Sequence, residues 1–192
     1  MNFPLCPRFQ AVLFDMDGTL LDTLSDMQDA VNHILLENGW PQRTLEEIRV
    51  FVGNGAAKLM ERAIPEPIAP QRFHEILSTY KDWYQAHNCV KTAPYPGIPE
   101  VLAELEKMGV KTAVVSNKPD ATTKALAEKF FPGMPALGQR DGVDPKPSPA
   151  LVAQALSDLG VRPENAVYVG DSEVDIQTAQ NCTMKYIGVS WG

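Results

Sequence analysis

The chain has 192 residues, of which 44% are hydrophobic and 21% are charged, and its formal net charge at pH 7 is −7. A chain of this length and apolar content can bury the core of one domain with a modest insertion. It lacks the clustered lysines and arginines of a nucleic-acid surface, and no apolar run approaches the length of a membrane span. The composition therefore argues against nucleic-acid and membrane partners.

The three cysteines are widely spaced and belong to no Cys/His cluster. This usage predicts a reducing compartment, buried inert thiols and no structural zinc. Residues 1–10 have no basic start followed by an apolar segment, so no secretory leader is predicted. We expect a soluble cytoplasmic protein.

Residues 9–15 form a short apolar run that ends on an aspartate, which is typical of a strand buried on both faces. A helix is predicted next, because Ser25 and Gln28 have capping-box spacing and apolar residues recur behind them at helical intervals. Gly39 and Pro41 end this helix.

The segment up to about residue 88 is predicted to be helical throughout. A second capping box, Thr44 with Glu47, opens a short helix, and Gly-Asn-Gly at 53–55 separates it from the next one. Residues 71–87 have the pattern of a longer amphipathic helix. These helices are therefore predicted to form an insertion after the first strand.

Strands and helices alternate after Pro-Tyr-Pro-Gly at 94–97. The first predicted elements are a helix ending at Gly109, a strand at 110–116 and a helix with Pro119 at its first position. A helix at 147–160 with Ser148 as N-cap comes next. The last elements are a strand at 165–171, a helix at 172–180 and a strand at 184–190. Such alternation indicates a parallel sheet with helices on both faces. The predicted fold is α/β, with a three-layer core formed by 1–20 and 93–192 and an inserted helical cap at 21–92.

Polar side chains follow several of the predicted strands at the point where each strand ends. They are Asp15, Asp17, Ser116, Asn117 and Asp171. In an open α/β sheet ligands bind beyond the carboxyl ends of the strands, so these side chains are expected to lie together. Lys146, in a loop stiffened by prolines on both sides, is expected to join them.

These residue types favour phosphoryl transfer at a metal. The carboxylates of Asp15 and Asp171 are the hard oxygen ligands that Mg2+ prefers, and a cation relieves the repulsion between neighbouring acids. Asp15 is placed to attack phosphorus, and Asp17 to protonate the leaving oxygen and then activate water. Lys146 and the Ser116 hydroxyl would stabilise the charge of the transferred group.

Four motifs occur along the chain: Asp15–Thr19 matches DxDGT, Ser116 ends a strand in VVSNK, Lys146 lies in PKPSP, and Gly170–Asp175 matches GDSxxD. Together they resemble the haloacid dehalogenase superfamily of phosphohydrolases, and the resemblance spans nearly the whole chain. It implies a Rossmann-like core with a small helical cap. The stretches FVGNGAAKLMERA, YPG and VVSNKP look most like phosphoglycolate phosphatases, which implies phosphoglycolate as the substrate.

The resemblance also implies residue roles, with Mg2+ as cofactor and a small phosphorylated metabolite as the bound molecule. The implied catalytic residues are Asp15 and Asp17. The implied metal site comprises Asp15, Asp17, Asp171 and Asp175. The implied phosphate site comprises Gly18, Thr19, Ser116, Asn117 and Lys146. The candidate for substrate contact from the cap is Asn54.

Several of these residues have an alternative interpretation. Asp175 follows a serine at capping-box spacing, so a helix cap and a metal ligand are equally supported. Asn54 could form only a helix-breaking turn, and Lys118 competes with Lys146 as the phosphate-binding lysine. Tyr84 is interpreted as a helix-packing residue.

Two departures from the family pattern lie near the C-terminus. The pattern GDSxxDxxxAxNAG has Cys182 and Thr183 here in place of Ala-Gly, so this turn is expected to be reshaped. Related chains continue beyond a segment like GVSWG at 188–192, so a truncated C-terminus is expected. A sheet edge exposed in this way would favour association, and we expect a monomer or a weak homo-oligomer.

Other functions share parts of this pattern. Dehalogenation is disfavoured by Asp17, because related dehalogenases have an aromatic residue there. Phosphonoacetaldehyde hydrolysis would need a cap amine, for which Lys58 is the candidate, and a sugar phosphomutase or a pyrophosphatase would keep the same core. A receiver-like signalling domain would not need the helical insertion, and a catalytically silent phosphate-binding protein stays open.

Overall fold

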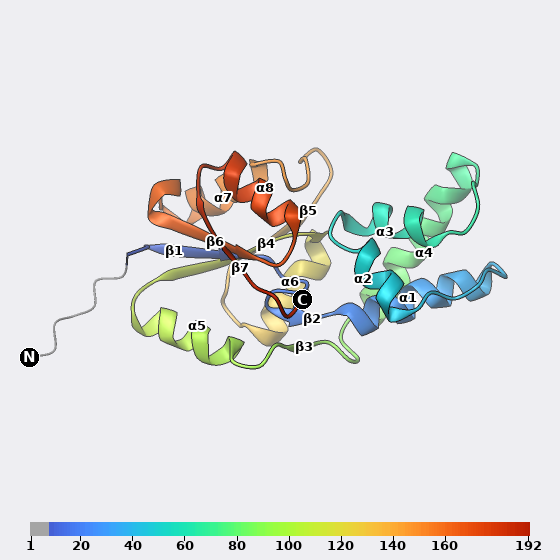
Figure 1. The fold of residues 1–192 in the computed structure, drawn as a ribbon, viewed down its shortest axis with the longest axis horizontal. Coiled ribbons are helices and arrows are strands. Elements are labelled where there is room, and N and C mark those ends of the chain that lie inside the picture. Colours follow the sequence, from blue (N-terminus) through green and yellow to red (C-terminus); the bar gives the residue numbers. More distant parts are fainter. Residues whose placement is uncertain (1–7) are drawn as a thin grey trace, which may run out of the picture.

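The computed structural model describes residues 8–192 and has two parts, an α/β core and a helical cap (Figure 1). The core is built on five parallel strands in the order β5-β4-β1-β6-β7. Their bounds are Ala11–Phe14 for β1, Lys111–Pro119 for β4, Ala136–Gln139 for β5, Ala166–Gly170 for β6 and Lys185–Gly188 for β7. The predicted α/β fold with a parallel sheet is confirmed.

The central strand β1 shows how the layers arise. Val12 and Phe14 belong to one buried cluster, while Ala11 and Leu13 belong to the cluster on the opposite face. The first face is covered by α5 and α6 and the second by α7 and α8, as Figure 1 shows with α7 and α8 above the sheet and α5 below it. The bounds of these helices are Ile98–Lys107, Asp120–Phe130, Ala150–Leu159 and Glu173–Asn181, and a short 3-10 helix, Pro163–Asn165, precedes β6. Because both faces are covered, β1 is apolar throughout.

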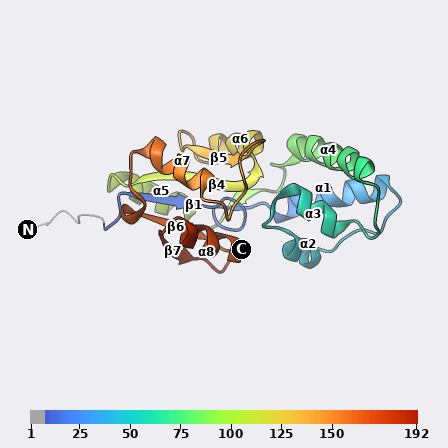
Figure 2. The same ribbon diagram turned by 90° about the horizontal axis from the view of Figure 1, so that it is seen from above.

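The cap consists of four helices, as the helical pattern predicted. They are α1 (Leu24–Glu37), α2 (Leu45–Phe51), α3 (Gly55–Ala63) and α4 (Pro70–His87). Their buried side chains, Ile34, Ile48 and Met60 among them, form a core separate from the two clusters of the sheet. Figure 2 shows the cap beyond one end of the sheet, which is the end where the functional candidates lie.

The cap joins the core through two short antiparallel strands, β2 (Leu21–Asp22) and β3 (Ala93–Pro94). Asp26 of α1 is buried and accepts hydrogen bonds from the backbone N–H groups of residues 90–92 and from the Thr92 hydroxyl. This carboxylate fixes the returning segment against the outgoing helix. We keep residues 21–92 as the proposed extent of the cap.

The start of α1 differs from the prediction. Its N-cap is Thr23, and the predicted capping box of Ser25 with Gln28 is wrong. The polar groups have other partners: the Thr23 hydroxyl donates to Asp17, and the Gln28 amide donates to the carbonyl of Arg43. The side chains at the start of α1 therefore do not cap the helix; Thr23 and Gln28 bind groups outside it instead.

Other helix starts are closer to the prediction. The capping box of Thr44 with Glu47 is confirmed at the start of α2. Pro119 is the N-cap of α6 and not its first residue, and the N-cap of α7 is Pro149 and not Ser148. These differences are shifts of one residue, within the usual uncertainty of helix boundaries.

β5 was not predicted, and β4 runs to Pro119, beyond its predicted end at 116. Cys89 and Cys182 are free thiols, only partly buried, so full burial is wrong for them; Cys6 and residues 1–7 as a whole lie outside the described part. Within residues 8–192, every helix is too short or too polar to traverse a bilayer.

Candidate active site

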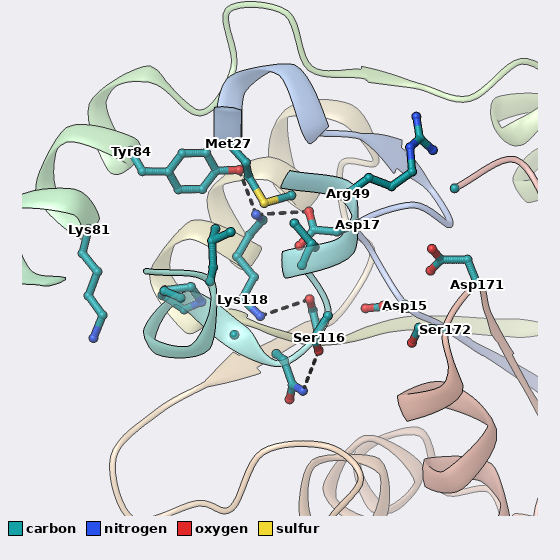
Figure 3. A pocket seen from close by; sticks show the side chains of 18 of the residues that line it. Asp15, Asp17, Met27, Arg49, Lys81, Tyr84, Ser116, Lys118, Asp171 and Ser172 are labelled. Atoms are coloured by element: carbon teal, nitrogen blue, oxygen red, sulfur yellow. Dashed lines mark hydrogen bonds and ion pairs between the residues drawn. The ribbon is translucent and has the colours of Figure 1, made fainter. Parts of the chain in front are cut away.

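Five of the predicted site residues line a cavity of about 290 Å³ between the core and the cap (Figure 3), namely Asp15, Asp17, Ser116, Asn117 and Asp171. Its core wall comes from the segments that follow β1 and β6, from the last residues of β4 and from Gly192, and its cap wall comes from all four cap helices. The core wall comprises Asp15, Asp17, Ser116, Asn117, Lys118, Pro119, Asp171, Ser172 and Gly192. The cap wall is largely apolar and aromatic, with Arg49 and Lys81 as its charged members.

Asp15 lies at the end of β1 and is 9% exposed. Its Oδ1 accepts a hydrogen bond from the Met16 N–H at 2.7 Å and lies 2.9 Å from Lys146 Nζ. Burial raises the pKa of Asp15 to about 7, against the lowering effect of Lys146, and the nearby Asp175 and Asp17 raise it further. The carboxylates around Asp15 thus carry more negative charge than Lys146 alone can offset.

Lys146 is the lysine beside Asp15. Its Nζ also lies 2.8 Å from Asp175 Oδ1 and 3.0 Å from the Tyr168 hydroxyl. Burial lowers the pKa of Lys146, but Asp15, Tyr168 and Asp175 together raise it well above its usual value. Lys146 is therefore a fixed cation between Asp15 and Asp175.

Three carboxylates could hold a metal ion. Asp15, Asp171 and Asp175 each offer an oxygen, and these oxygens lie within 4.8 Å of one another. Asp175 also closes the capping box of α8 with Ser172, so both of its predicted roles are compatible with its position. Burial, followed by the charge of Asp175, raises the pKa of Asp171. Asp17 is outside this group of three.

The loop after β1 packs tightly against Asp171. Thr19 donates from its hydroxyl to Asp171 Oδ1 at 3.2 Å. Gly18 has a φ of 78°, and a Cβ there would collide with the Asp171 carboxylate, so only glycine fits. The Trp191 indole donates to the Thr19 carbonyl at 3.1 Å, which brings the last residues to the same place.

Asp17 is held apart from the metal candidates. Its Oδ1 accepts a hydrogen bond from the Thr23 hydroxyl at 2.6 Å and lies 3.1 Å from Lys118 Nζ. Lys118 Nζ in turn donates to the Tyr84 hydroxyl of α4 at 2.8 Å (Figure 3). Burial raises the pKa of Tyr84 well above its usual range, so this phenol stays protonated.

Ser116 and Asn117 differ in how they face the cavity. Ser116 is buried in the core wall, and its Oγ accepts from the Lys118 N–H at 3.2 Å. The Asn117 side chain accepts from the Lys146 N–H at 2.7 Å and donates to the Lys146 carbonyl at 3.0 Å and the Gly53 carbonyl at 3.3 Å. Asn117 therefore braces the Lys146 loop and the cap loop.

The cap candidates face away from the cavity. Asn54 Oδ1 accepts from Arg62 at 2.9 Å, and its neighbours Gly53 and Gly55 line the cavity instead. Lys58 pairs with Glu61 at 2.7 Å on the exposed side of α3. The structure does not bring Asn54 or Lys58 to the acids.

Two contacts near Asp17 had no counterpart in the sequence analysis: the hydrogen bond from the Thr23 hydroxyl to Asp17, and the hydrogen bond from Lys118, the ion-pair partner of Asp17, to Tyr84. Tyr84 was expected only to pack against other helices, and Thr23 carried no expectation. Thr23 lies six positions after Asp17, which is no recognised motif spacing, and Tyr84 is far away in sequence. Only the paired acids of DxDGT, which need cationic or hydroxyl partners, signalled that such groups must exist.

The model of the haloacid dehalogenase-like hydrolase family matches residues 12–189. Phosphoglycolate phosphatase of Pseudomonas putida is 32% identical over 195 residues, covering 94% of this chain and 69% of that protein. N-acetylmuramic acid 6-phosphate phosphatase of Pseudomonas aeruginosa is 32% identical over 188 residues, covering 96% of this chain and 83% of that protein. Both relatives are phosphatases by name.

Solved structures show the same architecture. A crystal structure from Lactobacillus delbrueckii subsp. bulgaricus, provisionally assigned as a phosphoglycolate phosphatase, has a TM-score of 0.89 and 37% identity and covers 96% of this chain and 87% of that one. A CbbY variant from Rhodobacter sphaeroides in complex with xylulose-(1,5)bisphosphate has a TM-score of 0.78 and 25% identity, covering 95% and 86%. The resemblance inferred from the four motifs is confirmed. The chain therefore belongs to the haloacid dehalogenase-like hydrolase family, in which its similarity is to phosphatases.

Proposed function

We propose that this protein is a Mg2+-dependent phosphatase that hydrolyses a small phosphate monoester through an aspartyl-phosphate on Asp15, with phosphoglycolate as the first candidate substrate. The observation that carries the proposal is the set of groups around Asp15: Lys146 lies 2.9 Å away, and two further acids lie beside it, at a cavity lined by both the core and the cap. The names of the relatives support the same activity, and a cavity of about 290 Å³ suits a small ester.

The acid cluster fits a divalent cation. The three carboxylates have oxygens within 4.8 Å of one another, and two of them, Asp15 and Asp175, share the ammonium of Lys146. Asp15 and Asp171 would hold Mg2+, with Asp175 behind them, because Mg2+ prefers carboxylate oxygens. When bound, the ion would offset the charge of this cluster and of the phosphoryl oxygens. The side chain of Asp17 is left out of this proposed set, because it pairs with Lys118 and Thr23.

The side chains divide the reaction between them. Oδ1 of Asp15 contacts Met16 and Lys146, so Oδ2 attacks phosphorus as the ester P–O bond breaks, and Asp17, which enters this step in its protonated form, gives its proton to the leaving oxygen. A water then attacks phosphorus, Asp17 takes its proton, and the bond between phosphorus and Asp15 breaks. Lys146 stabilises the negative charge of the transferred group.

The cap supplies the environment for this chemistry. Leu59, Met27 and Tyr80 line its wall of the cavity with apolar surface. Such a wall excludes water while the aspartyl-phosphate forms, and it strengthens the electrostatic interactions inside. A loosely docked cap would expose the intermediate too early.

The test is phosphate release from a panel containing phosphoglycolate, p-nitrophenyl phosphate, pyrophosphate, hexose phosphates and N-acetylmuramic acid 6-phosphate. We expect Mg2+-dependent release from phosphoglycolate that EDTA abolishes and that Asp15→Asn lowers by roughly 10³-fold or more. The matched control is Asp158→Asn, an exposed position on α7 that should retain full activity.

The other outcomes discriminate between the remaining functions. Faster release from pyrophosphate or from a sugar phosphate would reassign the substrate, and phosphoryl transfer without net release would indicate a phosphomutase. Borohydride should trap no Schiff base, since Lys58 is paired with Glu61 outside the cavity. Folded protein that releases phosphate from none of these compounds would contradict the proposal and favour a silent binding protein.

A further inference from the structure

The site contains two buried lysines, and each pairs with a different aspartate of DxDGT. Lys146 Nζ lies 2.9 Å from Asp15, and Lys118 Nζ lies 3.1 Å from Asp17. Lys146 has a part in the mechanism above, whereas Lys118 has none. The Lys118 side chain is only 3% exposed, and a buried charge is costly unless its partners compensate it. The partners of Lys118 therefore indicate its role.

Lys118 joins three separate parts of the fold. It lies on β4 of the core, its carboxylate partner Asp17 follows β1, and its hydroxyl partner Tyr84 belongs to α4 of the cap. Its Nζ is 2.8 Å from the Tyr84 hydroxyl and 4.6 Å from the centre of the Tyr84 ring. Figure 3 shows Lys118 reaching between Tyr84 and Asp17. Lys118 is thus a physical link between the cap and Asp17.

A neighbouring contact attaches α4 to the same part of the core. Gln85, the residue after Tyr84, accepts a hydrogen bond from the Thr122 hydroxyl of α6. Thr122 lies four positions after Lys118, so two successive residues of α4 bind one short stretch of the core. The position of Tyr84 relative to Lys118 is therefore tied to how the cap docks.

The contacts at Asp17 fall on one of its two oxygens. The Thr23 hydroxyl donates to Oδ1 at 2.6 Å, and Lys118 Nζ is 3.1 Å from the same oxygen. Oδ2 is then the oxygen left to face a leaving group. A general acid needs this arrangement, because its carboxyl must be oriented toward the atom that it protonates.

We infer that Lys118 is a positioning residue, which orients Asp17 toward the leaving oxygen, and that Tyr84 makes this orientation depend on the docked cap. The inference rests on the proposed phosphatase function and deepens it. Lys118 acts through Asp17 and touches no reacting atom. If Tyr84 moved away with the cap, Lys118 would lose its hydroxyl partner and keep Asp17 as its carboxylate partner. The side chains of Lys118 and Asp17 would then be free to move.

The test compares two leaving groups in Lys118→Met and Tyr84→Phe. Alkoxide leaving from phosphoglycolate needs a proton, whereas p-nitrophenolate leaves from p-nitrophenyl phosphate without one. For phosphoglycolate, we expect kcat to fall about 100-fold in Lys118→Met and about 5-fold in Tyr84→Phe. For p-nitrophenyl phosphate, kcat should fall less than about 5-fold in either variant, with KM for both substrates changing by less than about 3-fold.

The controls separate positioning from folding. Activity of each variant on p-nitrophenyl phosphate reports that the nucleophile and the fold are intact, and Lys107→Met on the exposed side of α5 should behave as the unchanged protein. Equal losses on both substrates, or a rise in KM with kcat unchanged, would overturn the inference. No turnover of either ester by the unchanged protein would instead overturn the proposed function, and this inference with it.

Discussion

Thr183 adopts a backbone conformation that suits glycine. Its φ is 56°, and it is the one non-glycine residue with a positive φ among residues 8–192. A β-branched residue is strained there, because its Cβ approaches the following carbonyl oxygen. Thr183 lies in the turn between α8 and β7, where the family pattern has Gly. The departure from that pattern thus places a threonine where glycine would be relaxed.

Replacing Thr183 by glycine should therefore stabilise the protein. Relief of about 1–2 kcal/mol of left-handed strain exceeds the roughly 0.5–1 kcal/mol of chain entropy that glycine loses on folding. We expect the free energy of unfolding to rise by about 0.5–1 kcal/mol in Thr183→Gly, measured by urea denaturation. Thr183→Ala keeps the Cβ and should bring no such gain; a glycine variant no more stable than the alanine one would contradict the argument.

The residues that carry chemistry could be predicted from the sequence, but their partners could not. Asp15 and Asp171 each follow a strand and Ser116 lies near the end of β4, and parallel strands bring their carboxyl ends to one edge of the sheet. Tyr84 was interpreted as a helix-packing residue, but the residue that its hydroxyl contacts depends on how the cap docks on the core. Helical periodicity contains no information about Lys118, which contacts Tyr84 from another part of the fold.

At the scale of elements, β5 shows what the sequence could not predict. The strand has four residues, too few for a clear periodicity, and it contains Gly138. A Cβ at Gly138 would collide with the backbone of Asp120 at the start of α6. The glycine is thus present because strand and helix approach closely, a reason visible only in the folded chain. Longer elements such as α4 were predicted nearly to the residue.

The contact between β5 and α6 makes stability depend on pH through Asp120. Burial raises the pKa of this carboxyl, but bonds to Lys124 and to the Gly138 N–H, with the charge of Arg140, lower it overall. A folded-state pKa below the unfolded value, about 3.9, gives stability that is present above about pH 4 and lost as pH falls through the folded pKa.

Asp120→Asn should therefore lower the free energy of unfolding by about 1 kcal/mol at pH 7. The difference from the unchanged protein should shrink as pH falls below about 4, because the wild-type carboxyl is then protonated and neutral like the amide. Urea denaturation at a series of pH values measures this. Asp158→Asn, on the exposed part of α7, is the matched control. A difference that stays constant down to the lowest pH would exclude the charge as its cause.

At the scale of the whole molecule, the two parts have separate cores and meet around the cavity. The cap encloses its own apolar cluster, and it is linked to the core by β2 and β3 and by side chains such as Lys118 and Asn117. A series of segments with helical periodicity, and no strand-like pattern among them, between the first strand and the next made the cap predictable. The docking of cap on core was not, because it depends on contacts between residues far apart in sequence.

The acidic residues of the site lower the stability of the folded protein when no cation is bound, and the same residues would bind the cation. Burial and the charge of Asp175 raise the pKa of Asp171, which means that the folded protein disfavours its charged form when no cation is bound. Asp171→Asn removes that charge and keeps an acceptor for Thr19. Without Mg2+, in EDTA, this variant should therefore unfold at a temperature equal to or above that of the unchanged protein.

Addition of Mg2+ should reverse this order. At a concentration of about 100 times its Kd, the ion adds about 2.7 kcal/mol to the free energy of unfolding, which corresponds to roughly 5–10 °C for a chain of this size. The unchanged protein and the exposed variant Asp158→Asn should both show this rise, while Asp171→Asn should show little of it. The crossing of the two thermal curves distinguishes a metal site from an ordinary salt effect, since an ionic-strength effect would move all three proteins together. Equal shifts in all three would remove Asp171 from the proposed metal site, whereas a crossing would mean that the acids of this site are kept at the expense of stability because a cation is to be bound there.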